Sequence, residues 1–371
     1  MNILCATGIY PPEIGGPATF ATMIKKELPL RGHTVRIVTY ADARLLEEGV
    51  TSVMRALPKG ARHIAYFFAL VRNMFWADVV VALDPVSAGF PAMWVAHLFR
   101  KKFILRLVGD YAWEQGTQRY GVGALLDEFL DKTWSPPVER LRRIEKRVAL
   151  CARKVIVPSA YLASVVERWG VTKEKIVIVP NSVSAPVLSE KSVARASLGF
   201  TDECVVISVG RLVPWKGFAS LIDATKNLSI FLVIIGDGPD STALKERAAG
   251  AHNIRFTGAL PKDKLAQYLA AADIFALNTG YEGFSHQLIE AMAEGLAIAT
   301  TDAGGNKEVV KGDENALVVA YNAIDEWKRS IARLAGDSVL RERLGKNAQT
   351  TAALYTTKKT VDAFEQVLHS L

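Results

Sequence analysis

The stretch IFALNTGYEGFSHQLIEAMAEGLAIATT, residues 274–301, holds one complete unit of alternating structure. Apolar runs at residues 274–277 and 297–301 each predict a strand. Between them, Ser285 can cap the start of a helix and Gly295 can end it. A strand, a helix and a second strand in this order are typical of a parallel βαβ unit.

The same rhythm extends over most of the 371 residues, because short β-branched runs alternate with longer helical stretches. In the first half of the chain we expect strands at residues 2–6, 34–39, 78–83, 103–108, 154–157 and 175–179. In the second half we expect them at residues 204–209, 231–235, 253–256, 274–277, 297–301 and 316–319. Two parallel sheets of similar size, and therefore an α/β fold, follow from this pattern.

A division into two domains is indicated near residue 183. Residues 181–197 are rich in Ser, Val and Ala, show no sustained period and predict a connecting segment. We therefore expect an N-terminal domain over residues 1–182 and a C-terminal domain over residues 183–355. Residues 356–371 predict a last helix with one apolar face, and the sequence leaves open which domain receives it.

Composition restricts the class of protein. Half of the chain is apolar and 22% is charged, which indicates a folded chain. Cys5, Cys151 and Cys204 are far apart, so neither a disulfide framework nor a zinc site is expected, and a reducing cytoplasm fits best. Residues 76–99 are the most apolar, but Asp78 and two prolines interrupt them, so we expect no transmembrane helix. No secretory leader is expected either.

The net charge is +7, and the positive excess lies in the first half of the chain. A basic face could attract anionic lipid headgroups, a phosphorylated acceptor or nucleic acid. A protein of high pI without a charged partner fits equally well. Because no nucleic-acid motif is present, we expect no nucleic-acid partner and leave open a peripheral contact at the inner face of the membrane.

Two glutamates, Glu282 and Glu290, lie eight positions apart across the start of the expected helix. Eight helical residues span roughly 12 Å, about the distance from a donor sugar past two phosphates to a ribose. The free amides near Ser285 would face the diphosphate. Glu290 would then accept from the ribose diol, with Glu282 at the sugar end. The alternative is a solvated helix face.

These residues stand in a context that resembles the large GT-B glycosyltransferase family 4, whose mark is two glutamates separated by seven residues. The resemblance covers most of the chain and includes VGRLVPWKG (209–217), IGDGP (235–239), VPNSV (179–183) and TTDAGGNKE (300–308). It implies two Rossmann-like, doubly wound parallel-sheet domains that face each other across a cleft. It also implies an enzyme that retains the anomeric configuration of the sugar.

The resemblance implies that Arg211 and Lys216 hold the donor pyrophosphate, with Gly210 beside them. Charge on the leaving phosphate grows as the glycosidic bond breaks, so two cations would favour the transition state. A basic surface turn is the alternative. Besides Glu290, we assign Gly283, Phe284 and Ser285 to donor binding, and we count Glu282 with the catalytic residues.

Near the amino terminus, Gly15 and Gly16 follow the first expected strand and precede a helix. In the resembling family this loop approaches the donor phosphates, and two glycines would let backbone amides come close to them. A plain Gly-Pro turn is the alternative. The spacing is not that of a dinucleotide fingerprint, which makes a dehydrogenase a poor interpretation.

One position departs from the family pattern. Where many members carry a histidine near the reacting sugar, this chain has Asp110. A carboxylate there could orient an acceptor hydroxyl, take its proton or contact the sugar, or it could simply cap the next turn. Residues 113–134, rich in Gly and aromatic side chains, are expected to be an irregular insertion that either contacts substrate or elaborates the surface.

The expected function is therefore retaining transfer of a sugar from a UDP- or GDP-linked donor to a hydroxyl of a glycan or lipid-linked acceptor. Synthesis of cell-envelope polysaccharide, lipopolysaccharide or glycolipid fits this chemistry. No D-x-D motif is present, so neither a metal nor another cofactor is expected. A nucleotide-sugar epimerase, an inverting GT-B enzyme and a non-catalytic sugar-nucleotide binding subunit are the alternatives.

Overall fold

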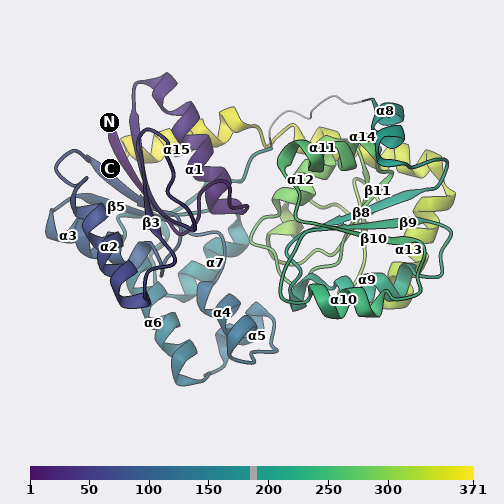
Figure 1. Cartoon of the computed structure of the whole chain (residues 1–371), viewed down its shortest axis with the longest axis horizontal. Helices are drawn as coiled ribbons and strands as arrows, with labels where there is room; N and C mark the ends of the chain where they lie inside the picture. Colours follow the sequence, from purple (N-terminus) through teal and green to yellow (C-terminus); the bar gives the residue numbers. More distant parts are fainter. Residues whose placement is uncertain (184–189) are drawn as a thin grey trace. The chain divides into compact units, whose positions relative to one another are not determined.

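The computed structural model describes residues 1–183 and 190–371, which form two compact units (Figure 1). Unit 1 consists of Met1–Pro180 together with Thr357–Leu371, and unit 2 of Asn181–Thr356. Each unit is built around one parallel sheet, which confirms the α/β class and the two Rossmann-like sheets expected from the sequence.

The sheet of unit 1 has the strand order β3-β2-β1-β4-β5-β6-β7. Its strands are β1 (Asn2–Thr7), β2 (Thr34–Ala41), β3 (Val50–Met54), β4 (Val79–Ala82), β5 (Lys102–Arg106), β6 (Lys154–Val157) and β7 (Ile176–Ile178). Its helices are α1 (Gly16–Glu27), α2 (Lys59–Val71), α3 (Gly89–Leu98), α4 (Tyr111–Arg119), α5 (Leu126–Asp131), α6 (Pro136–Cys151), α7 (Ala160–Arg168) and α15 (Thr357–His369). Central strands such as β4 are buried on both faces, so they read as continuous apolar runs.

The sheet of unit 2 has the strand order β10-β9-β8-β11-β12-β13. Its strands are β8 (Val205–Val209), β9 (Phe231–Ile235), β10 (Ile254–Gly258), β11 (Ile274–Leu277), β12 (Ala297–Thr300) and β13 (Leu317–Val318). Its helices are α8 (Lys191–Leu198), α9 (Phe218–Thr225), α10 (Ser241–Arg247), α11 (Lys262–Ala271), α12 (His286–Ala293), α13 (Ile324–Gly336) and α14 (Ser338–Ala352). Alternate residues of β8 point to opposite faces, since Ile207 packs with α11 and α12 whereas Val206 packs with α9 and α13.

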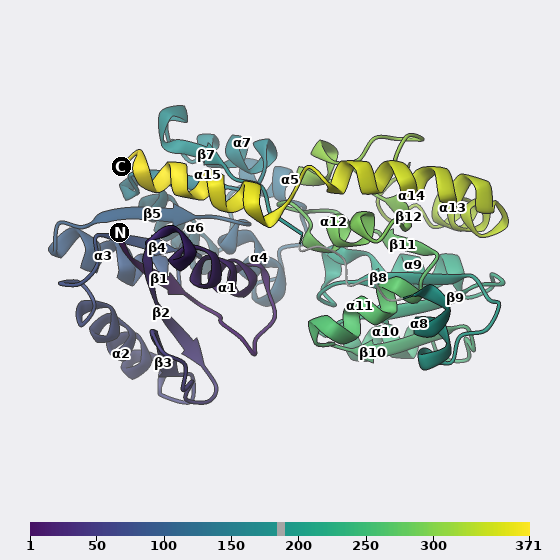
Figure 2. The same cartoon turned by 90° about the horizontal axis from the view of Figure 1, so that it is seen from above.

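The last helix, α15, belongs to unit 1, where it runs beside α1 (Figure 2). Phe364 is fully buried, and its ring meets the ring of Phe20 edge to face with 5.3 Å between centroids. Arg31 pairs with Asp362 at 2.6 Å and with Glu365 at 2.7 Å. The docking site that the sequence left open is therefore the helix that follows the first strand.

Three local expectations were wrong. The strand β3 was not expected, because the polar residues Thr51 and Ser52 interrupt its apolar residues. Residues 113–134 are not irregular throughout, since α4 and α5 occupy much of the segment. The connection expected at 181–197 contains most of α8, and its residues 184–189 lie outside the described part of the chain. Only Ala194 of α8 is buried, which leaves too weak an apolar period to detect.

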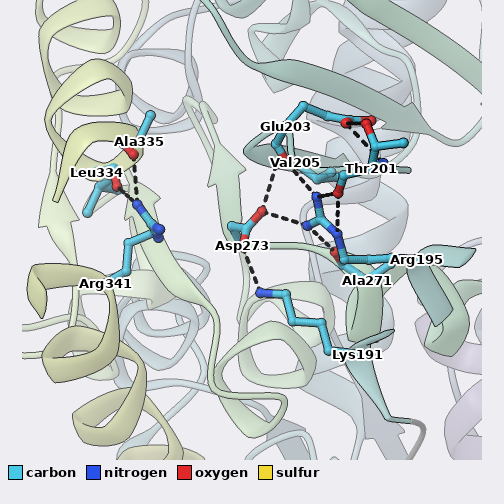
Figure 3. A network of polar contacts seen from close by, with 10 residues as sticks. All are labelled: Lys191, Arg195, Thr201, Glu203, Val205, Ala271, Asp273, Leu334, Ala335 and Arg341. Atoms are coloured by element: carbon cyan, nitrogen blue, oxygen red, sulfur yellow. Dashed lines mark hydrogen bonds and ion pairs between the residues drawn. The ribbon is translucent and has the colours of Figure 1, made fainter. Parts of the chain in front are cut away.

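A polar network holds α8 to the sheet of unit 2 (Figure 3). The Asp273 carboxylate, which directly precedes β11, pairs with Lys191 at 2.6 Å and with Arg195 at 3.1 Å. The backbone N–H of Val205 donates to the same carboxylate at 2.8 Å. Burial alone would raise the pKa of Asp273, but these three partners outweigh it and hold the pKa below its ordinary value.

We expect Asp273→Asn to lower the free energy of unfolding by roughly 1–3 kcal/mol, because two cations and one amide lose a charged acceptor. A carboxyl whose pKa is depressed on folding stabilises the fold above its unfolded pKa, and this contribution is lost as the pH falls through the folded value. Denaturant unfolding at pH 7 and at pH 3 should therefore show a smaller difference between native chain and variant at the lower pH. An equal difference at both values would contradict the network's role.

Candidate functional site

In unit 2 the strand order reverses between β8 and β11, and their carboxyl ends lie side by side. Ligands of doubly wound sheets bind outside the carboxyl ends of the strands at such a reversal. Gly210 and Arg211 follow β8 directly, and Lys216 ends the short 3-10 turn Pro214–Lys216. Glu282 lies in the segment after β11. The topology thus brings three of the four proposed catalytic residues to one place in the sheet.

Lys216 and Glu282 form an ion pair between Nζ and Oε1. Their side chains are only 11% and 10% exposed, although 66 positions separate them in the sequence. Charges interact more strongly where water is largely excluded, so the carboxylate fixes the position of the ammonium group. An incoming phosphate could share this ammonium, which has three donors.

The loop that carries Glu282 is packed tightly against the turn after β12. The backbone N–H of Gly305 donates to the Glu282 carbonyl oxygen at 2.8 Å. Gly304 has φ +56°, and a Cβ there would lie 2.2 Å from the same oxygen. Only glycine fits a left-handed position with so close an approach. The motif at 300–308 therefore fixes the backbone of Glu282.

The loop after β8 is constrained in the same way. Gly236 has φ +138°, and a Cβ there would lie 1.9 Å from the carbonyl oxygen of Gly210. The Gly210 N–H donates to Ile235 O at 3.0 Å. Gly236, the first glycine of the IGDGP motif, thus allows the end of β9 to pack directly against the backbone of Gly210, which precedes Arg211.

Helix α12 begins as expected. Ser285 is its N-cap, because its hydroxyl accepts from the Leu288 N–H at 3.3 Å, and Gly295 beyond its end has φ +75°. Phe284 is buried, with its ring 5.2 Å from that of Tyr355, so its side chain belongs to the core and only its backbone is left for a ligand. The Asn181 side-chain amide donates to the Phe284 carbonyl at 2.8 Å and fixes this backbone.

Glu290 lies within α12, and burial raises the pKa of its carboxyl above the ordinary value. Burial, followed by the nearby charge of Glu290, also raises the pKa of Glu294 to about 7. Hydrogen bonds from a ribose diol would favour the ionised form of Glu290 and so offset the effect of its burial. Its role, like those of Gly283 and Ser285 toward a donor, stays a prediction.

Asn306 is a candidate that the sequence did not single out. It is fully buried, and within residues 1–183 and 190–371 neither Oδ1 nor Nδ2 of its side chain has a hydrogen-bond partner. A buried amide without partners costs about 1–3 kcal/mol, so such groups are concentrated at functional positions. It follows Gly305, which contacts Glu282. Its place in the turn motif was visible in the sequence, but its burial was not.

In unit 1 the reversal lies between β1 and β4, and α1 starts near it. Gly15 is the N-cap of α1 and Gly16 is its first residue. No side chain caps this end, and no acidic residue lies in the first turn. The first amides of this twelve-residue helix therefore suit an anion.

Asp110 follows β5 and caps α4, since its carboxylate accepts from the Trp113 N–H at 2.8 Å. It is fully buried near the equally buried carboxyl of Glu145, and among the described residues Oδ2 of Asp110 and Oε1 of Glu145 have no hydrogen-bond partner. Glu145 in turn accepts from the Ala112 N–H at 3.1 Å. Burial raises the pKa of both carboxyls, that of Glu145 further through the nearby Asp110. The capping alternative is thus realised, and a direct role in chemistry stays a prediction.

No helix in the described ranges is both long and apolar enough to cross a bilayer.

Two family models match the chain. The model described as Glycosyl transferases group 1 matches residues 190–351, and the model described as Glycosyltransferase Family 4 matches residues 14–185. Together they cover both units. The Glu282 and Lys216 region falls in the first match, and Gly15, Gly16 and Asp110 fall in the second.

Individual relatives support the same assignment. The lipopolysaccharide core biosynthesis glycosyltransferase LpsE of Rhizobium meliloti is 30% identical over 185 residues, which are 48% of this chain and 54% of that protein. A GDP-mannose-dependent monoacylated alpha-(1-6)-phosphatidylinositol monomannoside mannosyltransferase of Corynebacterium glutamicum is 33% identical over 170 residues, 42% of this chain and 44% of that protein. The chain spans about half the length of these curated relatives.

Among solved structures, Anabaena Alr3699/HepE in complex with UDP-glucose matches with a TM-score of 0.81 and 21% identity over 100% of both chains. At this identity the likeness shows the fold.

Proposed function

The chain belongs to the family 4 glycosyltransferases of GT-B fold, and from this premise we propose that it moves a sugar from a nucleoside diphosphate donor to a hydroxyl acceptor with retention of configuration. The observation that carries the proposal is the Lys216–Glu282 ion pair at the strand reversal of unit 2. Arg211 lies two residues after the end of β8, in the same loop as Lys216.

The chemistry we propose depends on charge at the leaving group. As the bond between the anomeric carbon and the phosphate oxygen breaks, negative charge grows on the phosphate and positive charge on the sugar ring. Arg211 and Lys216 would stabilise the phosphate, and the carboxylate of Glu282 would lie on the sugar side. The acceptor attacks from the face of the departing phosphate, which takes the acceptor's proton. Because Arg211 and Lys216 would neutralise the phosphate charge, we propose that no metal is required.

We propose a UDP- or GDP-linked hexose as donor. The neighbour HepE was solved with UDP-glucose, and the Corynebacterium relative depends on GDP-mannose. Glu290 would then bind the ribose, a group that both nucleotides share. For the acceptor we propose an envelope glycan or lipid-linked precursor, because LpsE acts in lipopolysaccharide core biosynthesis and the first half of this chain is basic. A peripheral contact with an anionic membrane belongs to the same proposal.

The proposal is tested by incubating the chain with a panel of UDP- and GDP-sugars and following the products by NMR. We expect slow hydrolysis of one donor, release of UDP or GDP, and a free sugar that first has the anomeric configuration of the donor. Activity should persist in EDTA. Inversion of the anomer would assign an inverting enzyme, and an isomeric nucleotide sugar without release of nucleotide would assign an epimerase. If the chain bound a donor but turned over none of them, it would be assigned as a non-catalytic sugar-nucleotide binding subunit.

A further inference from the structure

Unit 1 has a pocket of about 500 Å³ at the amino ends of β5 and β6. The pocket is formed by the second half of α3, the end of α6, the first residues of β5 and the residues just before β6 and β7. All strands of this sheet are parallel, so they begin at one edge and end at the other. The pocket therefore lies at the opposite edge of the sheet from Asp110, which follows the carboxyl end of β5.

The charged side chains that line this pocket are all positive. Six cationic side chains line it: Arg100, Lys101, Lys102, Arg147, Arg153 and Lys175. In the described part of the chain, no Asp or Glu is among its lining residues. Among the described residues, the Lys175 side chain donates to Leu150 O at 2.9 Å, and the side chains of the other five cations have no hydrogen bond or ion pair. No acidic side chain that lines the pocket therefore offsets their positive charge, and a bound anion would do so.

Arg100, the first of these cations, has a strained backbone conformation. Arg100 has φ +52° directly after α3, where the Lys101 N–H donates back to Ala96 O at 2.8 Å. This is the helix-ending turn in which glycine is the usual residue. A side chain in this conformation costs roughly 1–2 kcal/mol. The turn directs three consecutive cations, residues 100–102, to the pocket.

Helix α6 contributes a cation that contacts an aromatic ring of α3. The guanidinium of Arg147 on α6 lies 5.0 Å from the ring centroid of Trp94 on α3. This stacking restricts the arginine, and a guanidinium offers paired N–H donors that match phosphate oxygens. Trp94 lines the pocket and is 42% exposed, so an apolar ring lies beside the cations.

We infer that this pocket binds the phosphate groups of an anionic ligand, as a soluble phosphate ester or as a phospholipid headgroup. Several Lys and Arg side chains around one pocket suit phosphate oxygens, each of which can accept charge-assisted hydrogen bonds from more than one donor. The inference does not rest on the proposed transfer reaction, because none of its residues belongs to the donor site of unit 2.

Cys151 provides a local readout, because it lines the pocket and is exposed. Cys5 is buried and Cys204 is half-buried, and burial raises the pKa of both thiols, so they should react more slowly with N-ethylmaleimide. Alkylation of Cys151 would be followed by peptide mass spectrometry with inorganic pyrophosphate, with phosphatidylglycerol vesicles or with phosphatidylcholine vesicles, at one ionic strength. At about ten times its Kd a ligand should slow the reaction roughly tenfold.

The variant Arg100→Gly/Lys101→Gln removes two charges and places glycine where the left-handed turn favours it, so we expect it to fold. Lys328→Gln/Arg329→Gln on α13 removes the same charge from an exposed helix face of unit 2 and serves as control. Protection by pyrophosphate in the native chain and the control, but not in the pocket variant, would identify a soluble ligand. Protection by phosphatidylglycerol alone would identify a headgroup. Unchanged alkylation with all three probes, or equal protection in the pocket variant, would overturn the inference.

Discussion

Replacing Lys216 with glutamine is expected to lower kcat for sugar transfer by about a hundredfold to a thousandfold, the usual effect of removing one donor aimed at charge that develops in the transition state. Lys216 is the largely buried partner of Glu282, and the proposed leaving group gains negative charge beside it. Glutamine keeps much of the length of the side chain but removes the charge. Initial rates at saturating donor measure the effect, and Lys328→Gln is the control for loss of one surface charge.

The ion pair adds a second arm to this experiment. Lys216→Gln leaves Glu282 largely buried without its cation, so Glu282→Gln and the double variant should be measured alongside it. If both residues act as one unit, the double variant will lose little more activity than either single variant. Full additivity of the two losses, or turnover that Lys216→Gln leaves untouched, would contradict the proposed role of the pair.

Gly304→Ala is expected to lower the melting temperature and to reduce kcat by about a hundredfold, although residue 304 carries no chemistry. A Cβ at this position would lie 2.2 Å from the Glu282 carbonyl oxygen, and the φ of +56° is strained for alanine. The loop must therefore move, and displacement of a site residue by about 1 Å can cost a hundredfold in rate. Thermal unfolding and initial rates separate the two effects.

Gly336→Ala is the matched control, because Gly336 lies in the last turn of α13 and a Cβ there meets no atom within 4 Å. This variant should keep full activity and gain up to about 1 kcal/mol in stability. If Gly304→Ala retained native activity at a temperature where it is folded, the turn at 303–306 would not be positioning Glu282.

Much of the fold could be predicted because a parallel sheet is buried on both faces. Its strands are short apolar runs, so twelve of the strands were expected within a few residues of their observed bounds. Thr51 and Ser52 interrupt the apolar residues of the edge strand β3, and α8 buries only Ala194, so neither produces a readable period. Helix α8 is held by Asp273, which is 82 positions from Lys191, and local pattern cannot show such a pairing.

In the candidate site, too, local features could be predicted from the sequence and tertiary contacts could not. Capping of α12 by Ser285 and its end at Gly295 are local, and the structure confirms both. The contact between Lys216 and Glu282 requires β8 and β11 to be neighbours, which follows only from the strand order. Burial of Asp110 against Glu145 and the unsatisfied amide of Asn306 depend on packing and had no signal in the sequence.

We propose above all that the diphosphate of the donor binds at the strand reversal of unit 2. Crystals of the chain grown with UDP or GDP test it most directly. The expected result places phosphate oxygens within about 2.7–2.9 Å of Arg211 and Lys216, with the ribose at Glu290. A nucleotide bound with its phosphates away from both cations would contradict the account.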